Sequence, residues 1–147
     1  MIVAWNCTDD RCEGVMDTEN LRILIVDDHM IMRSLIEKTA ISLGLKQISH
    51  AENGQQALDK INDGSVDIVL ADWNMPEMCG FDLLKAIRQN EDNNNLAFIM
   101  ITAESEGSKM MEAMNNGATA YLTKPFSSDD FRDTIDKILI WLEKRRN

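Results

Sequence analysis

The residues of this chain that could do chemistry stand at the ends of short apolar runs. They are Asp27, Asp28, Asp72, Thr102 and Lys124. Three carboxylates brought within a few ångströms repel one another unless a cation holds them, and a small cluster of carboxylate oxygens suits Mg²⁺ better than zinc or copper. The ammonium and the hydroxyl would then neutralise the oxygens of a phosphoryl group transferred to one carboxylate. This set of residues predicts a phosphoryl acceptor that uses Mg²⁺.

The apolar runs have the length of strands, and they alternate with segments whose apolar residues follow a helical spacing. Such an alternation with short links predicts one doubly wound α/β domain, in which a five-stranded parallel sheet carries five helices on its two faces. Glycines at the joints favour turns there. The predicted strands are residues 22–26, 47–51, 66–71, 96–101 and 119–122, and the helical segments are 32–43, 57–61, 83–87, 110–114 and 131–142.

Ligands of a doubly wound sheet bind at the carboxyl ends of the strands, where the strand order reverses. The candidate residues follow the first, third, fourth and fifth predicted strands. We therefore expect three carboxylates, a hydroxyl and an ammonium to meet at one edge of the sheet.

The chain has 147 residues, and its 25 acidic and 15 basic residues give a formal net charge of −10. This length suits one domain, and the acidic balance disfavours binding to nucleic acid or to an anionic membrane surface. Residues 1–20 lack an apolar period, so we expect a flexible extension there and the domain at 21–147. Neither a signal peptide nor a membrane span is recognisable, and Cys7, Cys12 and Cys79 form no disulfide or zinc pattern. We expect a cytoplasmic monomer with reduced thiols.

Three other activities fit the sequence less well. A flavodoxin-like electron carrier needs a loop rich in Ser, Thr and Gly after its first strand, but here the acidic loop at residues 27–30 repels phosphate. A phosphatase with an aspartyl nucleophile is disfavoured because the first two acids are adjacent rather than spaced Asp-x-Asp, and the best nucleophile follows the third strand. Nucleotide hydrolysis at a P-loop is excluded because the motif GxxxxGK[ST] is absent.

Four segments of the chain resemble the receiver domain of bacterial response regulators, and in detail the single-domain chemotaxis type, which is CheY-like. The resemblance covers about residues 20–147, implies a flavodoxin-like fold, and rests on motifs that are highly specific in combination. The segments are Val26-Asp27-Asp28, Asp72-Trp73-Asn74-Met75-Pro76 with Gly80, Ile101-Thr102-Ala103 and Tyr121-Leu122-Thr123-Lys124-Pro125-Phe126.

The resemblance implies a role for each residue at the phosphoryl site. Asp72 would accept the phosphoryl group from the phosphohistidine of a sensor histidine kinase. Mg²⁺ would be held by Asp27, Asp28, Asp72 and the main-chain carbonyl of Asn74, and Lys124 would pair with the acceptor carboxylate. The protein would then catalyse only its own phosphorylation and dephosphorylation, and it would be no enzyme in the usual sense.

The resemblance also implies a switch. Thr102 would move toward the phosphoryl group while the ring of Tyr121 turns inward, and the bond between Lys124 and Pro125 would be cis. One departure from the family pattern is Cys79, which replaces the aspartate that usually precedes the glycine after the acceptor segment and so weakens a turn cap.

The implied output is control of flagellar rotation through a motor switch protein, with a phosphatase as a further partner. This output surface departs from that of motor-binding relatives, which carry lysines where this chain has Gly107 and Thr134 and an aliphatic residue where it has Thr123. Met110 and Tyr121 belong to the same face. A methionine there could contact a helical partner, or it could pack in the core. The alternative output is that of a phosphate sink or phosphorelay shuttle that never binds the motor.

Overall fold

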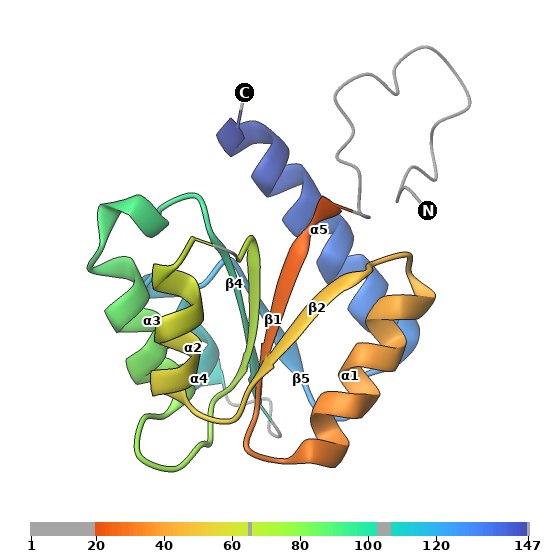
Figure 1. Ribbon diagram of the computed structural model, residues 1–147, viewed down its shortest axis with the longest axis horizontal. Coiled ribbons are helices and arrows are strands. Elements are labelled where there is room, and N and C mark those ends of the chain that lie inside the picture. Colours follow the sequence, from red (N-terminus) through yellow and green to blue (C-terminus); the bar gives the residue numbers. More distant parts are fainter. Residues whose placement is uncertain (1–19, 65, 103–106, 147) are drawn as a thin grey trace.

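The computed structural model describes residues 20–64, 66–102 and 107–146. Five parallel strands form one sheet in the order β2-β1-β3-β4-β5, with helices on both faces (Figure 1). The predicted fold class is confirmed, whereas residues 1–19 of the predicted extension lie outside the described residues. The strands are β1 (Arg22–Val26), β2 (Gln47–Ala51), β3 (Ile68–Asp72), β4 (Ala97–Thr102) and β5 (Ala120–Thr123). The helices are α1 (Met30–Ser42), α2 (Gly54–Asn62), α3 (Gly80–Arg88), the short 3-10 helix η3 (Glu91–Asn93), α4 (Gly107–Asn115) and α5 (Ser128–Arg146).

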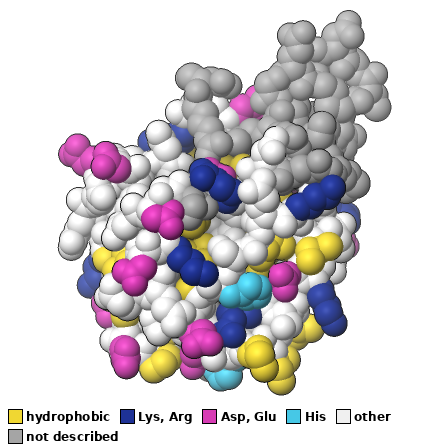
Figure 2. All heavy atoms as spheres, in the orientation of Figure 1, with side chains coloured by type: hydrophobic (Ala, Val, Ile, Leu, Met, Phe, Trp, Pro, Cys, Tyr) yellow, Lys and Arg dark blue, Asp and Glu magenta, His cyan; other side chains and the backbone are white. Residues whose placement is uncertain are grey.

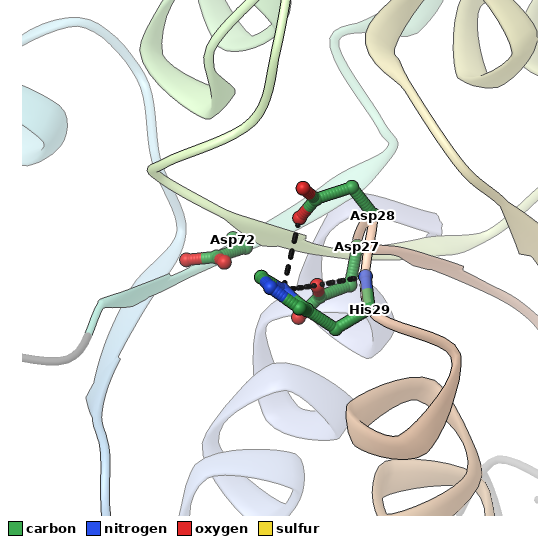
Figure 3. A group of neighbouring side chains, drawn as sticks. All are labelled: Asp27, Asp28, His29 and Asp72. Carbon is green, nitrogen blue, oxygen red and sulfur yellow. Dashed lines mark hydrogen bonds and ion pairs between the residues drawn. The ribbon is translucent and has the colours of Figure 1, made fainter.

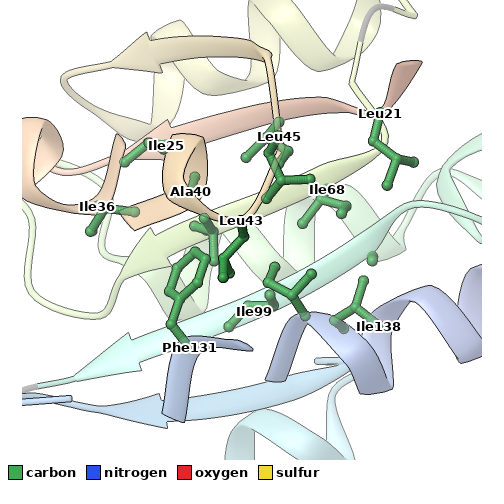
Figure 4. Close-up of a cluster of buried hydrophobic side chains, with 14 of the residues drawn as sticks. Leu21, Ile25, Ile36, Ala40, Leu43, Leu45, Ile68, Ile99, Phe131 and Ile138 are labelled. Carbon is green, nitrogen blue, oxygen red and sulfur yellow. The ribbon is translucent and has the colours of Figure 1, made fainter. Parts of the chain in front are cut away.

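Two apolar clusters hold the helices to the sheet. Helices α1 and α5 pack on one face through residues such as Ile36 and Phe131 (Figure 4), and α2, α3 and α4 pack on the other. Strands β1, β3 and β4 contribute to both clusters, so nearly every residue in them is buried, as their continuous apolar sequences predicted. Strands β2 and β5 lie at the edges and are only partly buried, which explains their more polar sequences.

Strands β1 and β3 are neighbours in the sheet, but the chain leaves them toward opposite faces, into α1 and α3. Between the ends of these two strands lies the point where the strand order reverses, and this is where such a sheet binds its ligands. Strand β3 ends at Asp72 and strand β4 ends at Thr102, so both candidate residues lie at the carboxyl edge of the sheet. The helix η3 was not predicted; the side chain of Asn90 caps it by accepting a bond from the backbone of Asp92.

Local chemistry at the joints agrees with the sequence. The side chain of Asn53 caps α2, and Gly117 has a φ of 102°, a conformation that a residue with a side chain rarely adopts. The bond between Lys124 and Pro125 is cis, as expected. Cys79 precedes α3 at the capping position and forms no side-chain cap, as its replacement of an aspartate implied.

Acidic and basic side chains are mixed on the face of the molecule shown in Figure 2, although the whole chain is acidic. The charge of any one site therefore depends more on the side chains nearby than on the net charge of the chain. Among the described residues, no helix combines the length and the apolar character that crossing a membrane requires.

Gly80 allows α3 to begin directly against the end of β3. Its backbone N–H donates to the carbonyl oxygen of Trp73 at 2.8 Å. A Cβ atom at this position would collide with the carbonyl oxygen of Asp72 and would lie 3.0 Å from the Cα of Trp73. Because these are backbone atoms, the strand end itself would have to move.

We expect Gly80→Ala to lower the free energy of unfolding by about 1–3 kcal/mol, the usual cost of overpacking. The matched control is Gly54→Ala, since Gly54 is also buried and begins a helix. The atoms nearest to an added Cβ there belong to the side chain of Met78, whose sulfur and Cγ can rotate away while its Cβ, at 2.9 Å, must shift slightly, so we expect a smaller loss. Denaturant unfolding followed by circular dichroism measures both variants. Equal losses in the two variants would contradict this account of Gly80.

Candidate functional site

Four titratable side chains meet beyond the ends of β1 and β3 (Figure 3). Asp27, Asp28, His29 and Asp72 each place one ligand atom within 4.8 Å of those of the others. Asp27 and Asp72 are buried, with 1% and 6% of their surface exposed, whereas Asp28 and His29 face solvent. The structure thus brings together the three carboxylates that the sequence placed at one edge.

Asp27 is fixed on three sides. Its backbone N–H donates to the carbonyl oxygen of Ala51 at 3.1 Å, and its carbonyl oxygen accepts from Nη1 of Arg33 at 2.6 Å. Its carboxylate Oδ1 accepts from the backbone N–H of His29 at 2.8 Å. Arg33 is a buried arginine that the sequence analysis did not single out, and it positions the backbone of this strand end.

Lys124 supplies the positive charge at this edge. Its Nζ lies 3.4 Å from Oδ2 of Asp72 and 3.5 Å from Oδ2 of Asp27. Its backbone N–H donates to the carbonyl oxygen of Thr102 at 2.6 Å, which anchors the segment after β5 to the end of β4. One ammonium therefore lies between two buried carboxylates that come from different strands.

The ionisation of Asp72 reflects opposing influences. Burial raises the pKa of its carboxyl above the ordinary value, because the charged form loses water. The ammonium of Lys124 lowers this pKa, and the carboxylate of Asp27 raises it. The backbone N–H of Asn74, 3.4 Å from Oδ1 of Asp72, also favours the charged form.

His29 is a neighbour of the acids that sequence reasoning missed. Its Nδ1 lies 3.2 Å from Oδ1 of Asp27 and 3.1 Å from Oδ1 of Asp28, and 71% of its side chain is exposed. The only signal was its place directly after the acidic pair, which we interpreted as part of a loop that repels phosphate. Its contacts to both acids restrain the exposed Asp28.

The donor set fits a hard divalent cation. Three carboxylates and one ammonium leave an excess of negative charge at this edge, and oxygen ligands from two strands are close enough to share one ion. Such ligands suit Mg²⁺, which keeps several waters and binds through a few carboxylates. The acidic cluster could therefore hold a metal ion.

Thr102 and Tyr121 lie on β4 and β5, the two strands that follow β3 across the sheet. Thr102 is 1% exposed and ends β4, which pairs with β3. Tyr121 lies in β5 opposite Met100, is half-buried, and packs against the cluster of α2, α3 and α4. The ring also lines a depression of about 390 Å³ between β5 and α5.

The predicted partner face is only partly exposed. Met110, like its neighbours Met111 and Met114, keeps between 43% and 64% of its surface in solvent, so these methionines are not core residues. Thr123 is half-buried, and Gly107 is the first residue of α4. Thr134, in contrast, is only 9% exposed, and its hydroxyl donates to the carbonyl oxygen of Asp130 at 2.9 Å. Thr134 nevertheless lines the depression that Tyr121 and Thr123 also line, so its place on the partner face stays a prediction.

Comparison with known proteins gives the same fold and shows the family. The sequence profile described as "Response regulator receiver domain" matches residues 23–136. Chemotaxis protein CheY-3 of Vibrio cholerae is 40% identical over 120 residues, which cover 82% of this chain and 92% of that protein. Chemotaxis protein CheY of Pseudomonas aeruginosa is 38% identical over 118 residues, or 80% of this chain and 95% of that protein.

Among solved structures, chemotaxis protein CheY4 of Vibrio cholerae superposes with a TM-score of 0.74 at 30% identity, covering 80% of this chain and 98% of that one. The profile spans well over half of the chain, and the relatives match it over nearly their whole length. The chain therefore belongs to the receiver domain family of response regulators, with relatives of the CheY type.

Proposed function

We propose that Asp72 accepts a phosphoryl group from a histidine kinase in a reaction that depends on Mg²⁺, and that the phosphorylated protein binds a partner that controls flagellar rotation. The observation that carries the proposal is the position of the Asp72 carboxylate, buried at the end of β3 with the Lys124 ammonium 3.4 Å away. Membership in the receiver family supports the kinase as phosphodonor.

The three acids differ in what they are free to do. One oxygen of Asp27 already accepts the His29 amide, and Asp28 is exposed beside the imidazole, so both suit metal binding. Asp72 is the acid best suited to attack phosphorus, with the kinase histidine as the leaving group. The bound Mg²⁺ would neutralise charge on the transferred group, with the carbonyl of Asn74 as a further ligand.

Lys124 and Thr102 would receive the phosphoryl oxygens. The ammonium, now between Asp27 and Asp72, can pair with an oxygen of the phosphoryl group once that group covers Asp72. The hydroxyl of the buried Thr102 can donate to another oxygen. Movement of Thr102 would leave space for the ring of Tyr121, so the surfaces of β5 and α4 would change together.

A chemotaxis output is supported by the names of the relatives, CheY-3 and CheY. The exposed methionines of α4 offer adaptable apolar contacts to a helical partner. The missing lysines at Gly107 and Thr134 favour the second candidate, a phosphate sink or phosphorelay shuttle. A cytoplasmic location and a partner phosphatase belong to the same proposal.

The acceptor is tested by phosphorylation with acetyl phosphate and Mg²⁺. We expect wild type to gain one acid-labile phosphoryl group and Asp72→Asn to gain none. Asp72 and Asp27 are both buried beside Lys124, but one oxygen of Asp27 already accepts from the His29 amide, which suits it to metal binding. Intact-mass spectrometry measures both, with Asp92→Asn as an exposed acid control that keeps its phosphorylation. Labelling that persists in Asp72→Asn but disappears in Asp28→Asn would move the acceptor to Asp28.

The metal site is tested with Asp28→Ala. Without metal, this variant should be more stable than wild type, because one of three repelling carboxylates is gone. It should also lose the stabilisation by Mg²⁺, which for wild type reaches about 2.7 kcal/mol when Mg²⁺ is in hundredfold excess over Kd. Thermal unfolding with and without Mg²⁺ measures this, and the fluorescence of Trp73, beside the acceptor, reports binding. Glu112→Ala, at an exposed acid of α4, should behave as wild type. An unchanged response to Mg²⁺ in Asp28→Ala would exclude Asp28 as a ligand.

The output surface is tested with an acidic peptide from a flagellar switch protein. Wild type should bind it weakly or not at all, and Gly107→Lys, Thr123→Val, Thr134→Lys should gain roughly tenfold in affinity, since each exposed ion pair contributes about 0.2–1 kcal/mol. Fluorescence anisotropy of the labelled peptide, with and without acetyl phosphate, measures both. A lysine at the exposed Gln89 controls for unspecific charge. Micromolar binding by wild type that phosphorylation strengthens would contradict the altered output surface, and it would support motor control over the phosphate sink or phosphorelay shuttle.

A further inference from the structure

A depression of about 280 Å³ lies at the end of the sheet opposite Asp72. Helices α3 and α5 run antiparallel to the strands, so their last residues lie at the end where the strands begin (Figure 1). Arg88 and Arg145, near the ends of these helices, line the depression together with Asn94, Trp141 and the turn at residues 117–119. We call it the two-arginine pocket.

The charge of the two-arginine pocket is opposite to that of the chain. Two guanidinium groups line it and, among the residues that the structure describes, no carboxylate does, although the protein carries a net charge of −10. Glu91, Asp92 and Glu143 are close in sequence to lining residues but do not line the pocket. Two like charges that share a partly buried space repel each other, and a bound anion would relieve that repulsion.

Arg88 is held rigidly and still has donors to offer. Its Nε donates to the carbonyl oxygen of Gly117 at 2.9 Å, its Nη1 to that of Asn93 at 2.7 Å, and its Nη2 to Oγ1 of Thr119 at 3.3 Å. Within the part of the chain that the structure describes, these bonds use three of the five N–H groups of a guanidinium and leave two for a ligand. Burial lowers the pKa of Arg88 and the neighbouring Arg145 lowers it further, which is the electrostatic cost of holding both charges here.

The hydroxyl of Thr119 adds a donor. Its Oγ1 accepts from Nη2 of Arg88 and from the backbone N–H of Phe98, the latter at 3.1 Å. An oxygen that already accepts two bonds directs its own proton elsewhere, and Thr119 lines the pocket. The hydrogen bonds of Arg88 and Thr119 therefore hold their remaining N–H and O–H groups in place at the wall of the pocket before any ligand binds.

Arg145 completes the pocket from α5. Its guanidinium stacks on the ring of Trp141, 4.8 Å from the ring centre, which restrains a side chain that would otherwise move freely in solvent. Stacking uses the face of the guanidinium and leaves the N–H groups at its edge, where bidentate bonds to an anion form. Arg88 also lines a second depression of about 260 Å³, to which Lys85 contributes a third cation.

We propose that the two-arginine pocket binds the phosphate group of a small molecule, either inorganic phosphate or a nucleoside phosphate. Two guanidinium groups match the charge of a phosphate dianion, and their planar forks match its oxygens. In the nucleoside phosphate the base would lie against the edge of the Trp141 ring, since the ring face carries the Arg145 guanidinium. This site is separate from Asp72 and does not depend on phosphoryl transfer there.

The test is a titration of the ¹⁵N-labelled full chain by NMR, at constant ionic strength and with EDTA to remove Mg²⁺. The probes are inorganic phosphate, adenosine monophosphate and adenosine. We expect saturable shifts of the Gly117 and Thr119 amides with both phosphates, and none with adenosine. Tighter binding of the nucleotide together with a shift of the Trp141 indole would identify a nucleoside phosphate as the ligand, and equal binding would identify the phosphate group alone.

Variants separate this site from unspecific attraction. Arg145→Gln should weaken binding about tenfold or more, Arg145→Lys should restore part of it, and Lys137→Gln, which removes a positive charge from the same helix outside the pocket, should leave it unchanged. Because Arg145 is exposed, its replacement should not unfold the protein, and unchanged amide shifts elsewhere would verify this. The proposal is overturned if no shift saturates, if Arg145→Gln binds like wild type, if adenosine binds as well as its monophosphate, or if the shifts are confined to Asp27 and Asp72.

Discussion

Repulsion between carboxylates at the carboxyl edge of the sheet is the constraint on which the rest of the site depends. Asp27 and Asp72 are buried at the ends of neighbouring strands, and a single ammonium, that of Lys124, lies within 3.5 Å of both. That ammonium comes from beyond β5, two strands away from β3, and its backbone is tied to Thr102 at the end of β4. Residues at or just after the ends of β1, β3, β4 and β5 thus set the charge of one small cluster. A balance held by so few groups responds strongly to an added cation or phosphoryl group.

The two ends of the sheet carry opposite chemistry, and β5 connects them. This strand begins after Thr119, whose hydroxyl meets Arg88, and it ends before Lys124, whose ammonium meets Asp72. Tyr121 lies between these two points, half-buried against the cluster that α4 also joins. Helix α5 runs antiparallel to β5, from the acidic end of the sheet to Arg145 at the opposite end. The elements that form the predicted output face are therefore the elements that join the acidic edge to the two-arginine pocket.

The strand ends were predictable because buried parallel strands have continuous apolar sequences and a polar residue marks each end. This pattern alone predicted that Asp27, Asp72, Thr102 and Lys124 lie at one edge of the sheet. Side-chain contacts made by arginines had no such signal. Arg33 reaches the carbonyl oxygen of Asp27, although the sequence suggests an exposed charge on a helix, and Arg88 and Arg145 are 57 positions apart. The burial of Thr134 had no signal for a different reason: a helical threonine can bond to its own backbone, and only the structure shows whether it does.

The central claim is that the carboxylate beside Lys124 carries the phosphoryl group. An acyl phosphate is reduced by borohydride to an alcohol, whereas a free carboxylate is not, so treatment after phosphorylation leaves a permanent mark on the acceptor. Digestion and peptide mass spectrometry then locate the reduced residue. The account predicts homoserine at position 72 alone, formed only when Mg²⁺ and a phosphodonor are both present. Reduction at position 27 or 28, or an unmodified chain after phosphate incorporation has been measured, would contradict it.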